Sequence, residues 1–405
     1  MMATMQIAQF LYSILLGTSI LLSGLGSSQA EFEIRAEEPI YAFGDHIEFA
    51  AVISPADQIE EVLLFLQDAR SSDIQVHPVF LEEDGSASLN VDLAEFPLSA
   101  FSDVEYWYQV NSIDGGSYAG SRNHFVYLDN RYDWRMLDSE PFKIHWYAGE
   151  LDFAEQVLDI VWAGHESVQD LMPVFFPESL DIYVYENPQA MQDALPETAR
   201  YWTAGHADPA LGVVLVSLPP GPDQQLEMER QIPHELMHIA LYYTDANAYT
   251  NLPAWFNEGL ASLAELYPDP GYQSMLERAY DIDQLLPLAS LCTTFPIDSQ
   301  DALLAYAESA SFTAYLHDQF GDPGLNKLMA AYASGLDCGH GVESALGTDL
   351  TNLENSWLRA NFAGNLLMNS LQEFLPWLII LLVILAGPII IGIVIIRKRP
   401  TRIEL

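Results

Sequence analysis

The stretch "IPHELMHIAL", Ile232–Leu241, carries two histidines four positions apart, with a glutamate directly after the first. On an α-helix a step of four residues returns to nearly the same face, so His234 and His238 can hold one metal ion. Glu235 projects toward the same opening and is placed to take a proton from a metal-bound water. The alternative interpretation is a buried structural helix that carries this pattern by chance. Pro233 either lies in the first turn of the helix or kinks it.

A catalytic zinc ion usually has three protein ligands, and the segment "LPAWFNEGLASLAELY", Leu252–Tyr267, supplies a third candidate. Its large apolar residues recur at helical spacing and predict a helix with one buried face. Glu258 lies off that apolar face, twenty positions after the second histidine and beside Gly259 and Ser262. Small residues there would let this helix approach the first one closely, which would bring the carboxylate to the metal.

"HELMH" followed by "WFNEGLA" resembles the gluzincins, which are zinc peptidases with two histidines and a glutamate, and specifically their peptidase MA-like group. A third block, "AYAESASFTAYLHDQFG", Ala305–Gly321, is similar to the segment that carries the catalytic tyrosine in aminopeptidase N relatives. The resemblance covers roughly residues 131–366. It implies a thermolysin-like catalytic domain that hydrolyses peptide bonds in peptide or protein substrates.

The resemblance also implies a role for each matching residue. His234, His238 and Glu258 would bind one Zn²⁺ per chain. Glu235 would be the general base, and Tyr306 would donate a hydrogen bond to the oxyanion.

This sequence departs from the relatives at several positions. The Gly-rich motif that captures a substrate amino terminus in aminopeptidases is not visible before His234. Four positions after Glu258, where thermolysin-like relatives have a carboxylate, this chain has Ser262. The segment "LGVVLVSL", residues 211–218, lies where a substrate-pairing edge strand would be expected, with an ordinary core strand as the alternative.

Residues 31–130 predict an all-β domain. "VEYWYQV", Val104–Val110, alternates between two faces with the period of two that strands have. Asp-Gly pairs at Asp84 and Asp114 lie where hairpin turns belong. About seven short strands in such a length favour an immunoglobulin-like or fibronectin-like sandwich that acts as a spacer or binding module.

Residues 131–366 change character. A stretch with helical spacing precedes two apolar strand-like segments, 180–186 and 211–218. Helices dominate after Gly221. Strands followed by a run of helices predict an α+β domain.

Both ends of the chain are apolar. Residues 1–30 carry no charge and end in small residues, which predicts a cleaved signal peptide, with an uncleaved anchor as the alternative. Residues 374–396 also lack charge, and about 20 apolar residues suffice for a transmembrane helix. The basic tail, residues 397–405, predicts a cytoplasmic C-terminus. We therefore expect a single-pass protein of the cell membrane with its catalytic domain outside.

The formal charge of −42 excludes nucleic acid and anionic lipid headgroups as favoured partners. The two cysteines, Cys292 and Cys338, could form a disulfide in an oxidising compartment or remain two buried thiols. The sequence as a whole favours a membrane-anchored extracellular zinc metallopeptidase. The competing interpretation is an adhesive or sensory surface protein without enzymatic activity on the same scaffold. The intact set of Glu235 and the three ligand candidates favours the enzyme.

Overall fold

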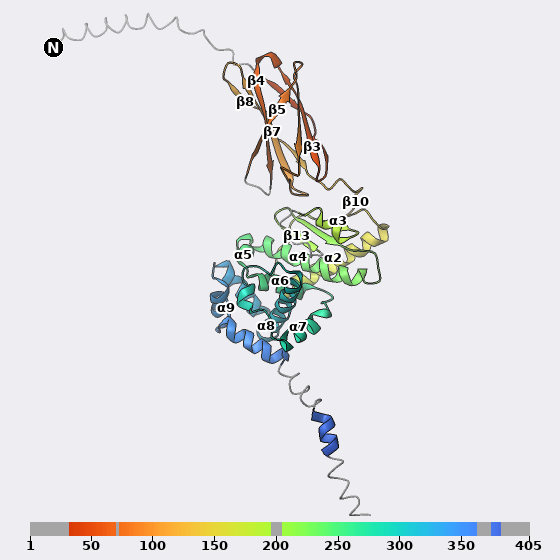
Figure 1. The fold of residues 1–405 in the computed structure, drawn as a ribbon, viewed down its shortest axis with the longest axis vertical. Helices are drawn as coiled ribbons and strands as arrows, with labels where there is room; N and C mark the ends of the chain where they lie inside the picture. Colours follow the sequence, from red (N-terminus) through yellow and green to blue (C-terminus); the bar gives the residue numbers. More distant parts are fainter. Residues whose placement is uncertain (1–31, 70–72, 196–204, 363–373, 382–405) are drawn as a thin grey trace, which may run out of the picture. The chain divides into compact units, whose positions relative to one another are not determined.

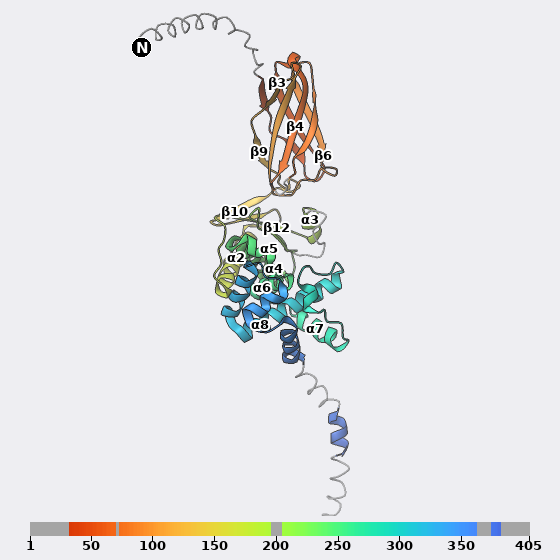
Figure 2. The same ribbon diagram turned by 90° about the vertical axis from the view of Figure 1, so that its left-hand side faces the viewer.

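A computed structural model of the chain describes residues 32–69, 73–195, 205–362 and 374–381. The chain forms two compact units that divide between Asp133 and Trp134. Figures 1 and 2 show a first unit built of strands and a second unit in which helices predominate.

The first unit contains nine antiparallel strands. Their path runs β1-β3-β6-β5-β4-β7-β8, with β2 paired to β3 and β9 paired to β7. The strands are β1 Glu33–Ala36, β2 Ile40–Ala42, β3 His46–Ser54, β4 Ile59–Asp68, β5 Gln75–Leu81, β6 Ser86–Asp92, β7 Asp103–Ser112, β8 Ser117–Ala119 and β9 Asn123–Val126.

The predicted all-β character of this unit is confirmed, but the predicted strand count of about seven was too low. Four of the nine strands, β1, β2, β8 and β9, are only three or four residues long, too short for an alternating pattern to reveal them.

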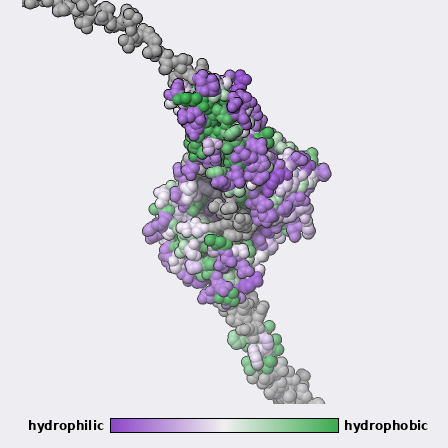
Figure 3. Space-filling model, turned by 45° about the horizontal axis from the view of Figure 1, so that its top comes forward, coloured by the Kyte–Doolittle hydropathy of each residue, from purple (hydrophilic) through white to green (hydrophobic). Residues whose placement is uncertain are grey.

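Alternate residues of the long strands form the core of the first unit. Ile47, Phe49 and Leu64 are almost completely buried, and each such side chain contributes about 1.5–3 kcal/mol relative to exposure. Several large apolar side chains point outward instead, including Ile40 and Phe80, and hydrophobic residues gather on the face that Figure 3 shows. The outside of this unit is therefore not uniformly polar.

The second unit begins with a five-stranded sheet in the order β10-β11-β12-β14-β13. Strands β11 Phe142–Trp146, β12 Leu180–Tyr185 and β14 Val213–Ser217 are parallel to one another. The edge strands β10 Arg135–Ser139 and β13 Gly205–Asp208 run antiparallel to their neighbours. The segment 211–218 therefore forms the interior strand β14, and β13 is the edge strand.

Helices make up the rest of the second unit, as the order of strands and helices in the sequence predicts. They are α2 Leu151–Leu171, α3 Pro188–Gln192, α4 Gln224–Thr244, α5 Ala246–Asn251, α6 Ala254–Ala264, α7 Gly271–Asp281, the 3₁₀ helix η2 Leu288–Leu291, α8 Ser299–Ala333 and α9 Cys338–Leu346. Residues 350–362 and 374–381 are also helical.

Helix α4 is the central helix of this unit, in contact with α2, α6 and the strands β13 and β14. It begins at Gln224, nine residues before Pro233, so the proline lies inside the helix. The proline ring packs against Gly164 of α2, where an added Cβ would lie 3.0 Å from Pro233 Cγ. Pro233 therefore lies inside α4 and not in its first turn, at a point where α4 packs closely against α2.

A similar close approach joins α6 to α8. A Cβ on Gly259 would lie only 2.0 Å from Oγ1 of Thr313, so any larger residue would push the two helices apart. Gly259 follows the third ligand candidate, Glu258, directly. The prediction that the small residues would admit the helix of the two histidines was wrong for Gly259, because the helix that this glycine admits is α8.

Cys292 and Cys338 form a disulfide with an S–S distance of 2.08 Å, which joins the segment after η2 to the start of α9. Of the predicted terminal segments, residues 1–30 and 382–396 lie outside the described residues. Within the part of the chain that the structure describes, no helix is long and apolar enough to cross a membrane. The membrane helix over residues 374–396, of which 374–381 are described, stays a prediction.

Candidate metal centre

Helices α4 and α6 bring three of the predicted site residues together. His234 and His238 project from consecutive turns of α4, and Glu258 faces them from α6. One ligand atom from each residue lies within 4.8 Å of the other two. Oε2 of Glu258 is 3.3 Å from Nε2 of His234 and 3.6 Å from Nε2 of His238. The two imidazoles therefore direct the same ring nitrogen toward one point.

The other ring nitrogen of each histidine has its own partner. Nδ1 of His234 lies 3.0 Å from Oε1 of Glu265, and Nδ1 of His238 lies 3.3 Å from Oδ1 of Asn257. Both partners are acceptors, so each Nδ1 carries the proton. When the imidazoles are neutral, this tautomer leaves their Nε2 lone pairs free for a metal.

Negative charge dominates this centre. Burial favours the neutral form of Glu258, but the nearby His238 and His234 outweigh it and hold the pKa of Glu258 well below its usual value. Burial would lower the pKa of His234, yet its hydrogen bonds to Glu258 and Glu265 hold that pKa well above the usual range. Two imidazoles surrounded by three carboxylates, counting Glu235, form a site that favours a divalent cation.

Glu235 lies between the metal ligands and the edge strand of the sheet. Its side chain is buried, and burial raises the pKa of its carboxyl, although His234 and His238 act in the opposite direction. The backbone N–H of Ala207 in β13 donates a hydrogen bond to this carboxylate. A Cβ on Gly205 would lie 2.5 Å from Oε1 of Glu235, so a larger residue there would displace the Glu235 side chain.

Two tyrosines lie beside the histidines. The ring of Tyr306, on α8, is 6.4 Å from that of His234 and packs edge-on against Phe295 at 5.0 Å. The ring of Tyr249, on α5, is 6.5 Å from that of His238. Burial raises the pKa of Tyr249 to about 12, so its hydroxyl keeps its proton at neutral pH.

Sequence reasoning identified Tyr306 but not Tyr249, Asn257, Glu265 or Ala207. The side chain of Asn257 bonds both to His238 and to Tyr249, so this one residue connects a ligand with a candidate donor. Glu265 lies seven positions after Glu258, just past the end of α6, rather than four positions after it. Asn257 and Glu265 lie in the "NEG" and "AEL" segments, but nothing in their spacing showed which histidine each would face.

Residues 168–363 match the family model of the Peptidase MA superfamily. The second unit contains a peptidase MA domain. The match runs from the last turn of α2 to beyond α9 and includes every residue of the candidate metal centre. This superfamily is the one that the resemblance of the motifs implied.

Among solved structures, an aminopeptidase N family protein from Idiomarina loihiensis is 7% identical, over 81% of this chain and 76% of that chain, with a TM-score of 0.39. A two-domain M1 zinc metallopeptidase bound to L-arginine is 12% identical, over 82% of this chain and 90% of that chain, with a TM-score of 0.31. A β-1,3-glucan binding domain of carbohydrate-binding module family 56 is 13% identical over 24% of this chain and 99% of that chain, with a TM-score of 0.17. No curated protein matches the chain.

Proposed function

We propose that this protein is a zinc-dependent peptidase of the gluzincin type, which hydrolyses peptide bonds with Glu235 as general base. The observation that carries this proposal is the convergence of His234, His238 and Glu258 within 4.8 Å, with the Glu235 carboxylate beside them.

The donor set suits zinc. Two imidazole nitrogens and one carboxylate oxygen are the ligands of a common catalytic zinc site, which keeps a fourth position open. The hydrogen bonds from the two Nδ1 atoms fix the imidazoles in the tautomer that zinc requires. Bound zinc would supply Lewis-acid polarisation of the substrate carbonyl and would lower the pKa of water.

Residues of this chain would transfer the proton, orient the general base and bind the substrate. Glu235 accepts a proton from the attacking water and then delivers it to the amine nitrogen as the C–N bond breaks. The Ala207 N–H holds the Glu235 carboxylate in place. The edge strand β13 offers backbone groups with which an extended substrate can pair.

Tyr306 and Tyr249 are the two candidates for a hydrogen bond to the oxyanion. Each lies next to one of the ligand histidines. Asn257 donates to the Tyr249 hydroxyl, so the phenolic proton of Tyr249 can turn toward the substrate oxygen.

The test combines zinc content with hydrolysis. The purified protein should contain about one zinc per chain and cleave members of an unstructured peptide library, and a chelator should abolish the cleavage. His238→Ala should lose most of its zinc. A zinc-loaded protein that cleaves no peptide would favour the alternative, an adhesive or sensory protein on a peptidase scaffold.

We also propose that the β unit is an immunoglobulin-like or fibronectin-like spacer and that the chain is anchored in the cell membrane, with both units outside. The charge-free segment 374–396 followed by a basic tail supports this orientation. Protease treatment of intact cells should release both units into the medium. Complete protection of the peptidase domain on intact cells would contradict the topology.

A further inference from the structure

A pocket of about 200 Å³ lies in the second unit, away from the candidate metal centre. It opens where the parallel strands β11, β12 and β14 end, between the first turns of α2 and α4. In open sheets of this kind, ligands bind in the crevice outside the carboxyl ends of the strands. The residues that line it include Phe153, Glu186, Leu218, Pro220 and Gln224.

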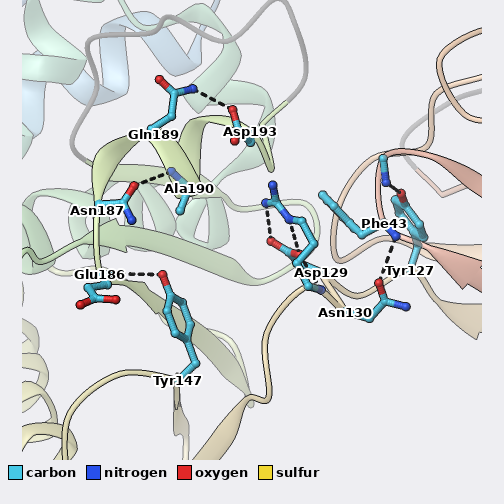
Figure 4. Close-up of polar contacts among 12 residues, drawn as sticks. Phe43, Tyr127, Asp129, Asn130, Tyr147, Glu186, Asn187, Gln189, Ala190 and Asp193 are labelled. Atoms are coloured by element: carbon cyan, nitrogen blue, oxygen red, sulfur yellow. Dashed lines mark hydrogen bonds and ion pairs between the residues drawn. The ribbon is translucent and has the colours of Figure 1, made fainter.

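The side chains that line this pocket offer hydrogen-bond acceptors. Nε2 of Gln224 donates to the carbonyl oxygen of Leu218 at 3.0 Å, which leaves the amide oxygen of Gln224 as an acceptor. The backbone N–H of Glu186 donates to the hydroxyl of Tyr147 at 3.0 Å, which fixes the end of β12 (Figure 4). The Glu186 carboxylate brings a negative charge to the rim, and none of the described lining residues is a lysine, arginine or histidine.

Charge around the pocket favours a cation. The amino-terminal ends of α2 and α4 would attract anions, but each helix begins with acids of its own, Glu150 and Asp152 in α2 and Asp223 and Glu227 in α4. The whole chain carries a formal charge of −42, so its field also attracts positive groups.

The size of the pocket limits its occupant. Pockets for whole small-molecule ligands usually measure about 300–1,000 Å³, so this one suits a single long side chain. The walls formed by Phe153, Leu218 and Pro220 can cover a methylene stem, while a positive head reaches Glu186. We propose that this pocket binds a lysine or arginine side chain of the polypeptide substrate.

The position of the pocket predicts where that basic residue lies in the substrate. Gln224 precedes His234 by ten residues on α4, a distance of about 15 Å along the helix axis. Gly205, which contacts Glu235, pairs with Val216 near the end of β14 that leads to the pocket. An extended substrate rises about 3.3 Å per residue, so one that runs parallel to α4 toward the pocket places the basic residue four or five positions from the cleaved bond.

This proposal rests on the proposed peptidase function, and its first test uses cleavage. A neutral peptide of known cleavage site is compared with versions that carry one lysine at each position in turn. Lysine four or five positions from the cleaved bond, on one side, should lower KM about tenfold, because hydrogen bonds to charged groups are worth roughly that factor. Glu186→Gln should remove this preference, whereas Glu178→Gln, which makes the same charge change at an exposed site outside the pocket, should keep it.

A second test separates the pocket from the chemistry. Zinc-loaded Glu235→Gln protein is titrated with the same labelled peptides, and fluorescence anisotropy reports binding without turnover. The peptide with the favourable lysine should bind about tenfold more tightly than the neutral one, and Glu186→Gln in this background should abolish the difference. If the wild-type protein cleaves nothing but this difference appears, the peptidase proposal fails and the pocket proposal stands.

Equal affinity for the neutral and lysine peptides would overturn the pocket proposal. So would a lysine preference that Glu178→Gln removes as fully as Glu186→Gln, because the general field of the protein would then explain it. Binding of free N-acetyl-lysine amide with no positional preference among peptides would show a site for small amines instead of a substrate contact.

Discussion

Glu235 and Glu258 have different environments, one suited to carrying a proton and the other to binding a metal. The Glu235 carboxylate accepts a hydrogen bond from the Ala207 N–H, and burial raises its pKa. The two histidines instead lower the pKa of Glu258. Two glutamates on neighbouring helices are thus tuned in opposite directions, which suits one to proton transfer and the other to metal binding.

Glu235→Gln should therefore retain zinc and lose activity. The amide keeps the shape of the side chain but cannot accept the proton of water, and general bases contribute typically about 10²–10⁴-fold to kcat. Zinc analysis and steady-state rates on the same sample check this prediction. A glutamine variant with nearly wild-type turnover would show that another residue is the base.

Glu265 is the residue that holds His234, and its side chain is only 3% exposed. Partners of this kind typically change metal affinity or activity by about 10–100-fold, because they orient the imidazole and raise its basicity. Glu265→Gln should weaken zinc binding in a chelator competition by about tenfold or more, while the circular dichroism spectrum stays unchanged. Unaltered zinc affinity would limit Glu265 to a structural role.

At this scale the sequence predicted the ligands well and their partners poorly. The step from His234 to His238 is a local feature, which helix geometry translates directly into a shared face. Glu265, Asn257 and Tyr249 depend on how the end of α6 and the short α5 pack around α4. No periodic pattern in the sequence encodes that packing.

At the scale of elements, α8 carries Tyr306 and α5 carries Tyr249, and the two helices approach opposite histidines of α4. Tyr306→Phe and Tyr249→Phe each remove one hydroxyl and keep the ring that packs there. The true oxyanion donor should lose about 10²–10³ in kcat with little change in KM, because its bond strengthens at the transition state. The other variant should remain within a few-fold of wild type. Full activity in both variants would exclude a tyrosine donor.

Helix α8 also buries an acid that holds a neighbouring segment in place. Oε1 of Glu308 accepts the N–H of Leu286 at 2.8 Å, and the side chain is completely buried. Glu354 binds the N–H of Leu288 in the same segment at 3.0 Å. Burial raises the pKa of Glu308 to about 8, and the charge of Glu354 acts in the same direction.

This buried acid predicts a pH dependence of stability. The folded pKa lies above the unfolded value of about 4.5, so unfolding releases a proton between these two pH values. The free energy of unfolding should fall as pH rises through this window, by at most about 1.4 kcal/mol per pH unit, and should level off above pH 8. Glu308→Gln should flatten this slope in urea titrations from pH 5 to 8. Parallel slopes for the two proteins would refute the assignment.

Long strands were predictable from the sequence, whereas a short strand and its place in the sheet were not. The alternation in β7 and the apolar stretches of β12 and β14 are long enough for their periodicity to be visible. The four-residue edge strand β13 was not, and the prediction considered the stronger β14 signal for the edge position instead. Sheet order depends on crossovers, so a single sequence does not reveal which strand lies outermost.

At the scale of the whole molecule, the acidic composition and the disulfide each agree with one of the proposals. A net charge of −42 keeps the chain soluble and directs positive groups toward it, which agrees with the proposed basic-residue pocket. A disulfide persists in oxidising compartments, which agrees with the proposed position of both units outside the cell.

The disulfide closes a chain segment with a sequence separation of 46 residues that contains all of α8, so it fixes the helix that carries Tyr306. In the chain-entropy model a loop of this size contributes about 4 kcal/mol, because the bond restricts the unfolded chain. Trp255 of α6 lies against it, with its indole nitrogen 3.3 Å from the sulfur of Cys338. The bond therefore supports the helix of the third ligand as well as α8.

Replacement of both cysteines by serine should lower the free energy of unfolding by about 2–4 kcal/mol in urea, measured on zinc-loaded protein. Reducing agent should have the same effect on the wild-type protein and none on the double variant. Activity at low temperature should survive, because neither cysteine touches the metal centre. If the double variant matched wild-type stability, the disulfide would contribute nothing to the stability of the fold.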